Sequence, residues 1–185
     1  MVQQIDQRID RRFTHLRQAF ERALAIREGS PSPNPLEVAQ SLSNLGGLLR
    51  REGDVEGAVI LLERALAMRE AGSGPDSRLV ALTLANLGDA LREAGELDRS
   101  RTALERSVAI LERGPDRDSR NLFAALNNLG LVKLNAKQFE EAERLFRLLL
   151  RQAIPTGLFA EENDPRTGDH LGNYPLGLSH AALIN

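Results

Sequence analysis

The sequence predicts an all-α fold in which antiparallel helix pairs stack into a solenoid. The first observation is a Leu-x-Asn-Leu-Gly motif that occurs three times, ending at Gly46, Gly88 and Gly130, each copy 42 residues after the previous one. The second is that apolar residues between the Gly- and Pro-containing breaks recur at intervals of three and four, which is typical of amphipathic helices. A fixed period of this length indicates units that bury a core only by stacking on their neighbours.

Composition narrows the classes of function. The 185 residues carry 24 basic and 26 acidic side chains, a net charge of −2, which disfavours binding to nucleic acid or to anionic lipid. Cysteine is absent, so disulfides and thiol catalysis are excluded. There is no signal-peptide pattern and no run of about 18 apolar residues. We expect a cytoplasmic protein without a membrane segment, and no motif indicates a metal or a cofactor.

The first predicted helix covers residues 3–28. The segment 29–35 ends it, because its three prolines remove backbone donors and fix φ. Shifting the chain by 42 residues aligns 20–28, Phe-Glu-Arg-Ala-Leu-Ala-Ile-Arg-Glu, with 62–70, Leu-Glu-Arg-Ala-Leu-Ala-Met-Arg-Glu. The first helix therefore corresponds to the second helix of a repeat whose first helix is missing.

Three full helix pairs are predicted after this orphan helix. They lie in repeats 36–71, 77–113 and 119–153, with short turns inside each pair and Gly- and Pro-containing breaks between pairs. The predicted helices cover 36–51 and 55–71, 77–93 and 97–113, and 119–135 and 139–153. Together with the orphan helix they form a predicted helical repeat domain over residues 1–153.

The spacing of small and large apolar residues inside each unit resembles that of the tetratricopeptide repeat. In the first unit these residues are Leu42, Leu45, Gly46, Leu49, Ala58, Leu62 and Ala65. The period of 42, longer than the usual period of about 34, and the Asn-Leu-Gly sequence resemble the subclass found in kinesin light chains, over about residues 5–153. The resemblance implies a right-handed α-α superhelix whose first helices line a concave groove, and a scaffold that binds a peptide or a partner protein.

Asn44, Asn86 and Asn128 occupy the position at which members of this family often hold the main chain of a peptide. An amide suits this role because it donates and accepts hydrogen bonds at once. Alternatively, the three asparagines satisfy polar groups within or between the helices. Further candidates for the groove surface are Arg50, Asp89, Arg92, Asn127 and Leu131, with Gln40, Ser43, Gly47, Arg51, Leu82, Ala85, Glu93, Ala124 and Asn135.

Arg50 and Arg92 allow two interpretations. Each guanidinium could hold a ligand carboxylate through two parallel hydrogen bonds. Charged residues on helix faces are more often solvated or paired with neighbouring acids, and this second interpretation is favoured. The Ala-, Leu-, Glu- and Arg-rich second helices, such as 61–68, also leave self-association through a dimer face as an option.

The tail, residues 154–185, does not follow the repeat. Its elements at 157–162, 164–168, 171–175 and 179–185 resemble the C-terminal end of the catalytic domain of glycoside hydrolase family 15, the glucoamylases and trehalose hydrolases. The resemblance implies that Glu161 matches the general base of that family. Inverting hydrolysis needs a second carboxyl group about 6.5–9.5 Å away, which the tail does not supply, and the chain has no Trp for a sugar platform. The alternative function is therefore a fragment or accessory of such an enzyme, inactive alone.

A structural role for the tail is a further hypothesis. A terminal repeat needs a cover for its open apolar face. The tail could cap the last helix pair with Phe159, Leu171, Tyr174, Leu176, Leu178, Leu183 and Ile184.

Overall fold

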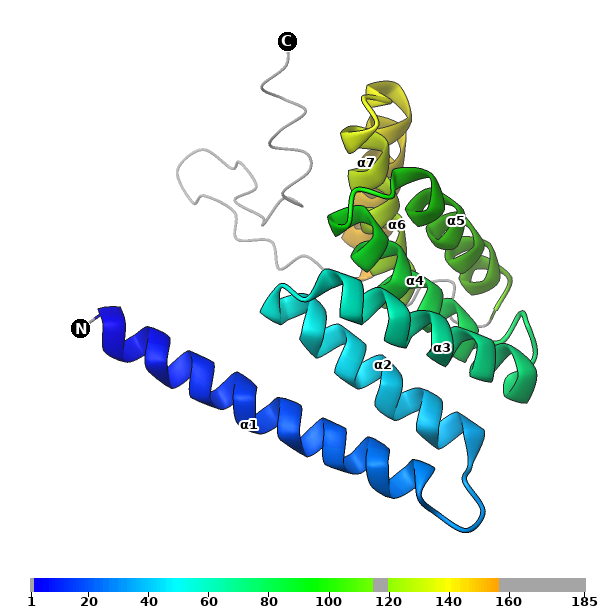
Figure 1. The fold of residues 1–185 in the computed structure, drawn as a ribbon. Helices are drawn as coiled ribbons and strands as arrows, with labels where there is room; N and C mark the ends of the chain where they lie inside the picture. Colours follow the sequence, from blue (N-terminus) through cyan, green and yellow to red (C-terminus); the bar gives the residue numbers. More distant parts are fainter. Residues whose placement is uncertain (1, 115–119, 157–185) are drawn as a thin grey trace. The chain divides into compact units, whose positions relative to one another are not determined.

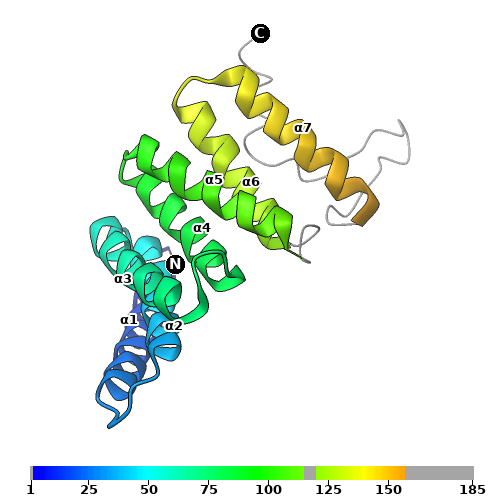
Figure 2. The ribbon, with the colours of Figure 1, turned by 90° about the vertical axis from the view of Figure 1, so that its right-hand side faces the viewer.

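Seven α-helices make up most of the part of the chain that the structure describes (Figures 1 and 2). The structure is a computed structural model that describes the backbone of residues 2–114 and 120–156 and the side chains of residues 14–114 and 120–149. The helices are α1 (Val2–Glu28), α2 (Pro35–Glu52), α3 (Val55–Ser73), α4 (Arg78–Glu93), α5 (Leu97–Arg113), α6 (Arg120–Asn135) and α7 (Phe139–Thr156). The prediction of an all-α fold is confirmed. Glu161 and the proposed capping residues lie outside the described residues.

Polar side chains cap the N-termini of α2, α3 and α4. Asn34 Oδ1 accepts from Leu36 N at 3.0 Å, and Asp54 Oδ1 accepts from Gly57 N at 3.0 Å. Ser77 Oγ accepts a longer bond of 3.3 Å from the first turn of α4. The first turn of a helix has backbone N–H groups without helical partners, so each cap satisfies one of them.

The turns inside the three helix pairs share one backbone conformation. Gly53, Gly95 and Lys137 have φ values of 89°, 80° and 60°, and they lie at equivalent positions of the repeat. In each turn the N–H of this residue donates to the carbonyl three residues earlier, at 3.0–3.1 Å. Glycine adopts a positive φ without steric cost, whereas a residue with a Cβ does not. The third turn therefore keeps the geometry of the first two at the expense of strain at Lys137.

The chain divides into two compact units, one up to Glu96 and one from Leu97. In the first unit α1 contacts α2, α2 contacts α3, and α4 contacts both α3 and α2. In the second unit α5 contacts α6 and α6 contacts α7. The ribbons show helices that run side by side within each unit (Figure 2).

Two of the repeated glycines, Gly46 and Gly130, lie close against the second helix of their pair. A Cβ added at Gly46 would lie 3.0 Å from Leu62 Cγ, and one added at Gly130 would lie 2.8 Å from ring atoms of Phe146. Leu62 and Phe146 are almost fully buried. The glycine thus makes room for the large residue of the second helix, as the spacing of the motif predicts.

Candidate functional site

Asn44 and Asn86 lie exposed on α2 and α4, the first helices of two successive pairs in the first unit. Asn128 is half-buried on α6, in the second unit. Within the described part of the chain, the side chains of Asn86 and Asn128 form no hydrogen bond, and Asn44 forms one, with Gln40. We call the surface of α2 and α4 around Asn44, Asn86 and their charged neighbours the first-helix face.

A cluster of four charged side chains joins α2 to α4 on this face. Arg50 NH1 lies 2.8 Å from Asp89 Oδ2 and 2.6 Å from Glu93 Oε1. Arg92 NH2 lies 2.8 Å from Asp89 Oδ1 and 3.4 Å from Glu93 Oε1. The four side chains are 15–30% exposed, and their formal charges sum to zero. Both arginines are therefore paired with neighbouring acids, as the favoured interpretation expects, and neither is a free receptor for a ligand carboxylate.

The cluster occurs once because its residues are not repeated. Arg50 reaches acids that lie 39 and 43 residues further along the chain, Asp89 and Glu93. The residues 39 and 43 positions after Arg92 are Leu131 and Asn135, and neither is acidic. Arg92 pairs with the acids of its own helix, Asp89 and Glu93. A comparison of Arg50 with residues about one repeat away would have named Asp89 and Glu93 as candidate partners, without showing that their helices face each other.

A buried arginine underneath the first-helix face was not predicted. Arg69 on α3 is 4% exposed, and its NH1 donates to Thr83 Oγ1 at 2.5 Å and to Leu79 O at 3.2 Å, both on α4. Its NH2 donates to Gln40 Oε1 on α2 at 2.7 Å. Burial lowers the pKa of the Arg69 guanidinium from its ordinary value, but an arginine remains charged near neutral pH. Arg69 therefore ties three helices together.

The same contact occurs one repeat earlier. Arg27 NH1 on α1 donates to Glu37 O at 3.0 Å and to Ser41 Oγ at 2.6 Å. Arg27 and Ser41 are 42 residues before Arg69 and Thr83. The signal was present in the sequence, because the alignment of 20–28 with 62–70 matches the two arginines, but nothing in it indicated a buried donor.

Other predicted groove residues have mixed outcomes. Asn127 and Leu131 are half-buried on α6, and they stay candidates for a surface contact. Ser43 is 4% exposed, so its prediction as a groove residue is wrong. Ser43 is on the side of α2 that packs into the unit, between Leu42 and Leu45 of the motif.

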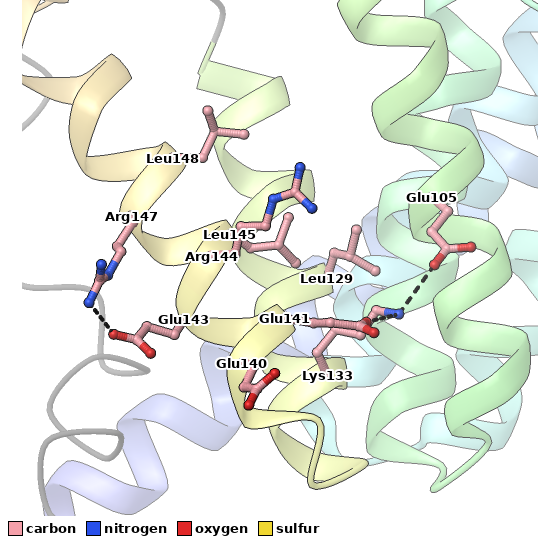
Figure 3. A pocket seen from close by; sticks show the side chains of 10 residues that line it. All are labelled: Glu105, Leu129, Lys133, Glu140, Glu141, Glu143, Arg144, Leu145, Arg147 and Leu148. Carbon is pink, nitrogen blue, oxygen red and sulfur yellow. Dashed lines mark hydrogen bonds and ion pairs between the residues drawn. The ribbon is translucent and has the colours of Figure 1, made fainter.

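The second unit contains an open pocket of about 780 Å³ between α5, α6 and α7 (Figure 3). Its apolar lining consists of Leu129 on α6 and of Leu145 and Leu148 on α7, and charged side chains surround these residues. The charged residues are Glu105, Lys133, Glu140, Glu141, Glu143, Arg144 and Arg147. This pocket was not predicted from the sequence, and it is not lined by any of the predicted asparagines.

Lys133 occupies a leucine position of the repeat in this pocket. The equivalent residues Leu49 and Leu91 are 5% and 2% exposed, whereas the side chain of Lys133 is 12% exposed. Its Nζ lies 2.8 Å from Glu141 Oε2 and 3.5 Å from Glu105 Oε1 (Figure 3). The hydrogen bond from Lys133 lowers the pKa of Glu141. A lysine is thus tolerated in a packing position because two carboxylates at the rim compensate its charge.

The described residues contain neither a candidate metal site nor a candidate membrane-spanning helix. Among the side chains of residues 14–114 and 120–149, no three of His, Cys, Asp or Glu are placed to hold a metal ion. Within 2–114 and 120–156, no helix is both long and apolar enough to span a bilayer.

The helical part of the chain matches a family model. The model of the tetratricopeptide repeat fits residues 10–71, 37–113 and 79–154. Among solved structures, BtubC (BKLC) from P. vanneervenii superimposes with a TM-score of 0.71 at 18% identity, over 79% of this chain and 57% of that one. The nearly identical TPR-like repeats of a Podosopora anserina protein described as a kinesin light chain give a TM-score of 0.64 at 21% identity, over 80% and 70%. These likenesses show the fold.

A short stretch of the chain is similar to trehalases. The trehalase of Mycolicibacterium smegmatis is 50% identical over 48 residues, which is 26% of this chain and 7% of the enzyme. The trehalase of Mycobacterium tuberculosis is 54% identical over 44 residues, 24% of this chain and 6% of the enzyme. The chain spans less than a tenth of the length of these curated relatives, so the match does not comprise a catalytic domain.

Proposed function

The chain belongs to the tetratricopeptide repeat family, and from this premise we propose that it is a protein-interaction scaffold. Its partner is a peptide or a protein segment that binds across the first helices of successive pairs. Asn44, Asn86 and Asn128 are the principal contacts, because their amides can pair with the N–H and C=O groups of a bound main chain. The repeat period gives the three asparagines the same register on α2, α4 and α6.

The observation that carries this proposal is the availability of the amides. The side chains of Asn86 and Asn128 have no hydrogen-bond partner among the described residues, and Asn44 uses only its oxygen. A structural role within the solenoid would require such partners. The surrounding charge is balanced by the Arg50, Asp89, Arg92 and Glu93 cluster, which favours a neutral main chain over an acidic side chain as the recognised group.

A displayed random peptide library tests the proposal. We expect peptides selected on the wild-type protein to lose binding to the triple variant Asn44→Ala, Asn86→Ala, Asn128→Ala. Ile60→Ala is the matched control, because Ile60 is 65% exposed on α3, a second helix, and offers an apolar surface away from the asparagines. Selected peptides that bind the triple variant as well as the wild type would reject the asparagines as the contact residues.

The similarity to trehalases supports a second candidate function. The tail, residues 154–185, would then be a separate segment, a fragment or accessory of a family 15 glycoside hydrolase, with Glu161 as an inherited general base. An inverting hydrolase also requires a general acid on the opposite side of the sugar, and the match covers 7% or less of the enzymes. We therefore expect the tail to contribute no turnover to this chain alone.

Incubation of the purified chain with trehalose and maltooligosaccharides distinguishes the two candidates. The scaffold proposal expects no release of glucose from either substrate. Hydrolysis that disappears in Glu161→Gln would establish the second candidate and overturn the expectation of an inactive tail.

A cytoplasmic location and a protein partner are part of the first proposal, and fractionation of cells with an antibody to the chain tests the location.

A further inference from the structure

We infer that Arg69 sets, through Gln40, the orientation of the Asn44 amide, so that the first-helix face offers an N–H donor at this position. The partner group opposite Asn44 is then an acceptor, a carbonyl oxygen of an extended partner segment. This inference rests on the proposed function for the identity of the partner group. The orientation of the amide itself is a property of the free protein.

The first step is the contact between Arg69 and Gln40. A guanidinium carries only N–H donors and has no acceptor atom. The Gln40 atom that lies 2.7 Å from Arg69 NH2 must therefore be the amide oxygen, Oε1. The identity of one end of the Gln40 amide fixes the other end, because the two ends are an oxygen and an NH₂ group.

The second step passes this polarity to Asn44. Gln40 Nε2 lies 2.8 Å from Asn44, one helical turn further along α2, and an NH₂ group can only donate to it. Asn44 therefore turns its oxygen, Oδ1, toward Gln40. Its Nδ2 group is left without a partner among the described residues and is the atom available to a ligand.

We call the chain of hydrogen bonds from Arg69 through Gln40 to Asn44 the relay. The Arg69 guanidinium, at which the relay begins, is held in place by buried hydrogen bonds. Arg69 is 4% exposed, and its second terminal nitrogen, NH1, is engaged by Thr83 Oγ1 and Leu79 O on α4, whereas its Nε is buried without a hydrogen-bond partner among the described residues. Thr83 is fully buried and donates its own hydroxyl to Leu79 O at 2.9 Å. The guanidinium cannot turn away from Gln40 without breaking these buried bonds, so the orientation of the relay is fixed from the core outward.

Asn44 alone has this relay. The residues equivalent to Gln40 in the next two repeats are Leu82 and Ala124, and the residue equivalent to Arg69 is Leu111. Asn86 and Asn128 therefore have no neighbour that selects one orientation of the amide, and each can donate or accept. The three asparagines differ in that only Asn44 has its NH₂ group held outward as a donor for an acceptor on the partner.

The variant Gln40→Glu tests the relay because it should reverse the orientation of the Asn44 amide. A carboxylate at position 40 still accepts from Arg69, so the fold is kept, but it cannot donate to Asn44. The Asn44 amide must then turn its Nδ2 group toward Glu and its Oδ1 outward. Gln40→Leu, which places the residue of the second repeat at this position, removes the relay without reversing it.

Hydrogen exchange of side-chain amide protons, followed by NMR on the free protein, reads out the orientation. In the wild type, the Gln40 Nε2 protons should exchange about fivefold more slowly than those of Asn86, and the Asn44 Nδ2 protons as fast as those of Asn86. In Gln40→Glu, exchange of the Asn44 protons should slow by about the same factor. Asn86 serves as the internal control and should not change.

Two results would overturn the inference. One is unprotected Gln40 Nε2 protons in the wild type, and the other is unchanged exchange of the Asn44 protons in Gln40→Glu. In Gln40→Leu the Asn44 protons should exchange as in the wild type, and protection there would also contradict the relay. No partner is present in this experiment, so its failure leaves the scaffold proposal standing, and a protein that binds no peptide can still show the relay.

Discussion

Arg69 and Thr83 are joined by a hydrogen bond of 2.5 Å between two side chains that are at most 4% exposed, across the boundary between two repeats. Arg27 and Ser41 form the equivalent bond at 2.6 Å across the preceding boundary. At the third boundary the equivalent residues are Leu111 and Ala125, both buried and apolar. The two equivalent positions at these boundaries therefore hold either two residues joined by a polar contact or two buried apolar residues, and both residues change together.

This relationship predicts a non-additive effect of two substitutions. Arg69→Leu should lower the free energy of unfolding by about 2–3 kcal/mol, because charge-assisted hydrogen bonds are lost and the buried Thr83 hydroxyl loses its donor. Adding Thr83→Ala reproduces the Leu111 and Ala125 pair and should recover about 1 kcal/mol or more. Chemical denaturation of the two single variants and the double variant measures the coupling.

Arg64→Leu is the matched control for this cycle. Arg64 is 53% exposed on the same helix and pairs with Glu28 at 2.6 Å. An exposed ion pair contributes little, so its removal should change the free energy of unfolding by less than about 1 kcal/mol. Strictly additive effects of Arg69→Leu and Thr83→Ala would contradict the pairing of the two positions.

Lys133→Leu should stabilise the second unit. The variant restores the leucine found at positions 49 and 91, and Glu105 and Glu141 are exposed enough to return to water without cost. Burial of the leucine side chain should add about 1 kcal/mol to the free energy of unfolding. A thermal melt at neutral pH measures the gain, and a lower melting temperature would show that the ion pairs of Lys133 contribute more to stability than a buried leucine would.

The same variant should change the dependence of stability on pH. Lys133 lowers the pKa of Glu141 below its ordinary value of 4.5. The ion pair by itself therefore favours the folded state above that pH, by less than the predicted gain from burying a leucine, and this small contribution is lost as the pH falls through the lowered pKa. In Lys133→Leu the pKa of Glu141, followed by NMR titration of its carboxyl carbon, should rise. An unchanged pKa would contradict the contact with Lys133.

Two adjacent glycines should respond oppositely to alanine. Gly46→Ala places a Cβ 3.0 Å from Leu62 Cγ and 3.3 Å from Ala58 O and should destabilise the protein by about 1–3 kcal/mol. Gly47→Ala meets nothing within 4 Å and should stabilise α2 by up to about 1 kcal/mol through helix propensity. Urea denaturation of both variants measures the difference, and equal effects would contradict the close approach at Gly46.

Lys137→Gly should relieve strain in the third turn. Lys137 has a φ of 60°, whereas the equivalent residues of the other two turns are glycines. Removal of the Cβ from this conformation should raise the free energy of unfolding by about 1 kcal/mol. The reciprocal change Gly95→Lys should lower it by a similar amount. A destabilised Lys137→Gly would indicate that the turn does not keep this conformation.

The sequence period predicted the helices, the turns between them and the packing role of the motif glycine. These features depend on residues that are close in the chain or that recur every 42 residues. It did not predict the burial of Arg69, since an arginine on a helix is exposed unless other helices supply acceptors for it. Arg50 was expected from the sequence to pair with neighbouring acids, but its partners Asp89 and Glu93 could not be identified. Their identity depends on which helices face each other.

The pocket beside Lys133 could also not be predicted from the sequence pattern. Lys133 is equivalent to Leu49, a packing position of the first unit, but the spacing does not show which carboxylates contact the lysine amine. Glu105 and Glu141 lie on two other helices of the unit, and only the packing of α5 and α7 around α6 brings them to Lys133. Local sequence patterns thus predicted the helices and turns, whereas the long-range polar contacts could be identified only in the structure.

The affinity of a library-selected peptide for Asn86→Ala tests the scaffold proposal most directly. Asn86 is exposed and has no partner among the described residues, so alanine should leave the fold intact. Calorimetric titration of the selected peptide should show binding at least about tenfold weaker than to the wild type, as expected when main-chain hydrogen bonds are lost. Ile60→Ala should bind like the wild type. Unchanged affinity in Asn86→Ala, and in the corresponding variants of Asn44 and Asn128, would contradict the account.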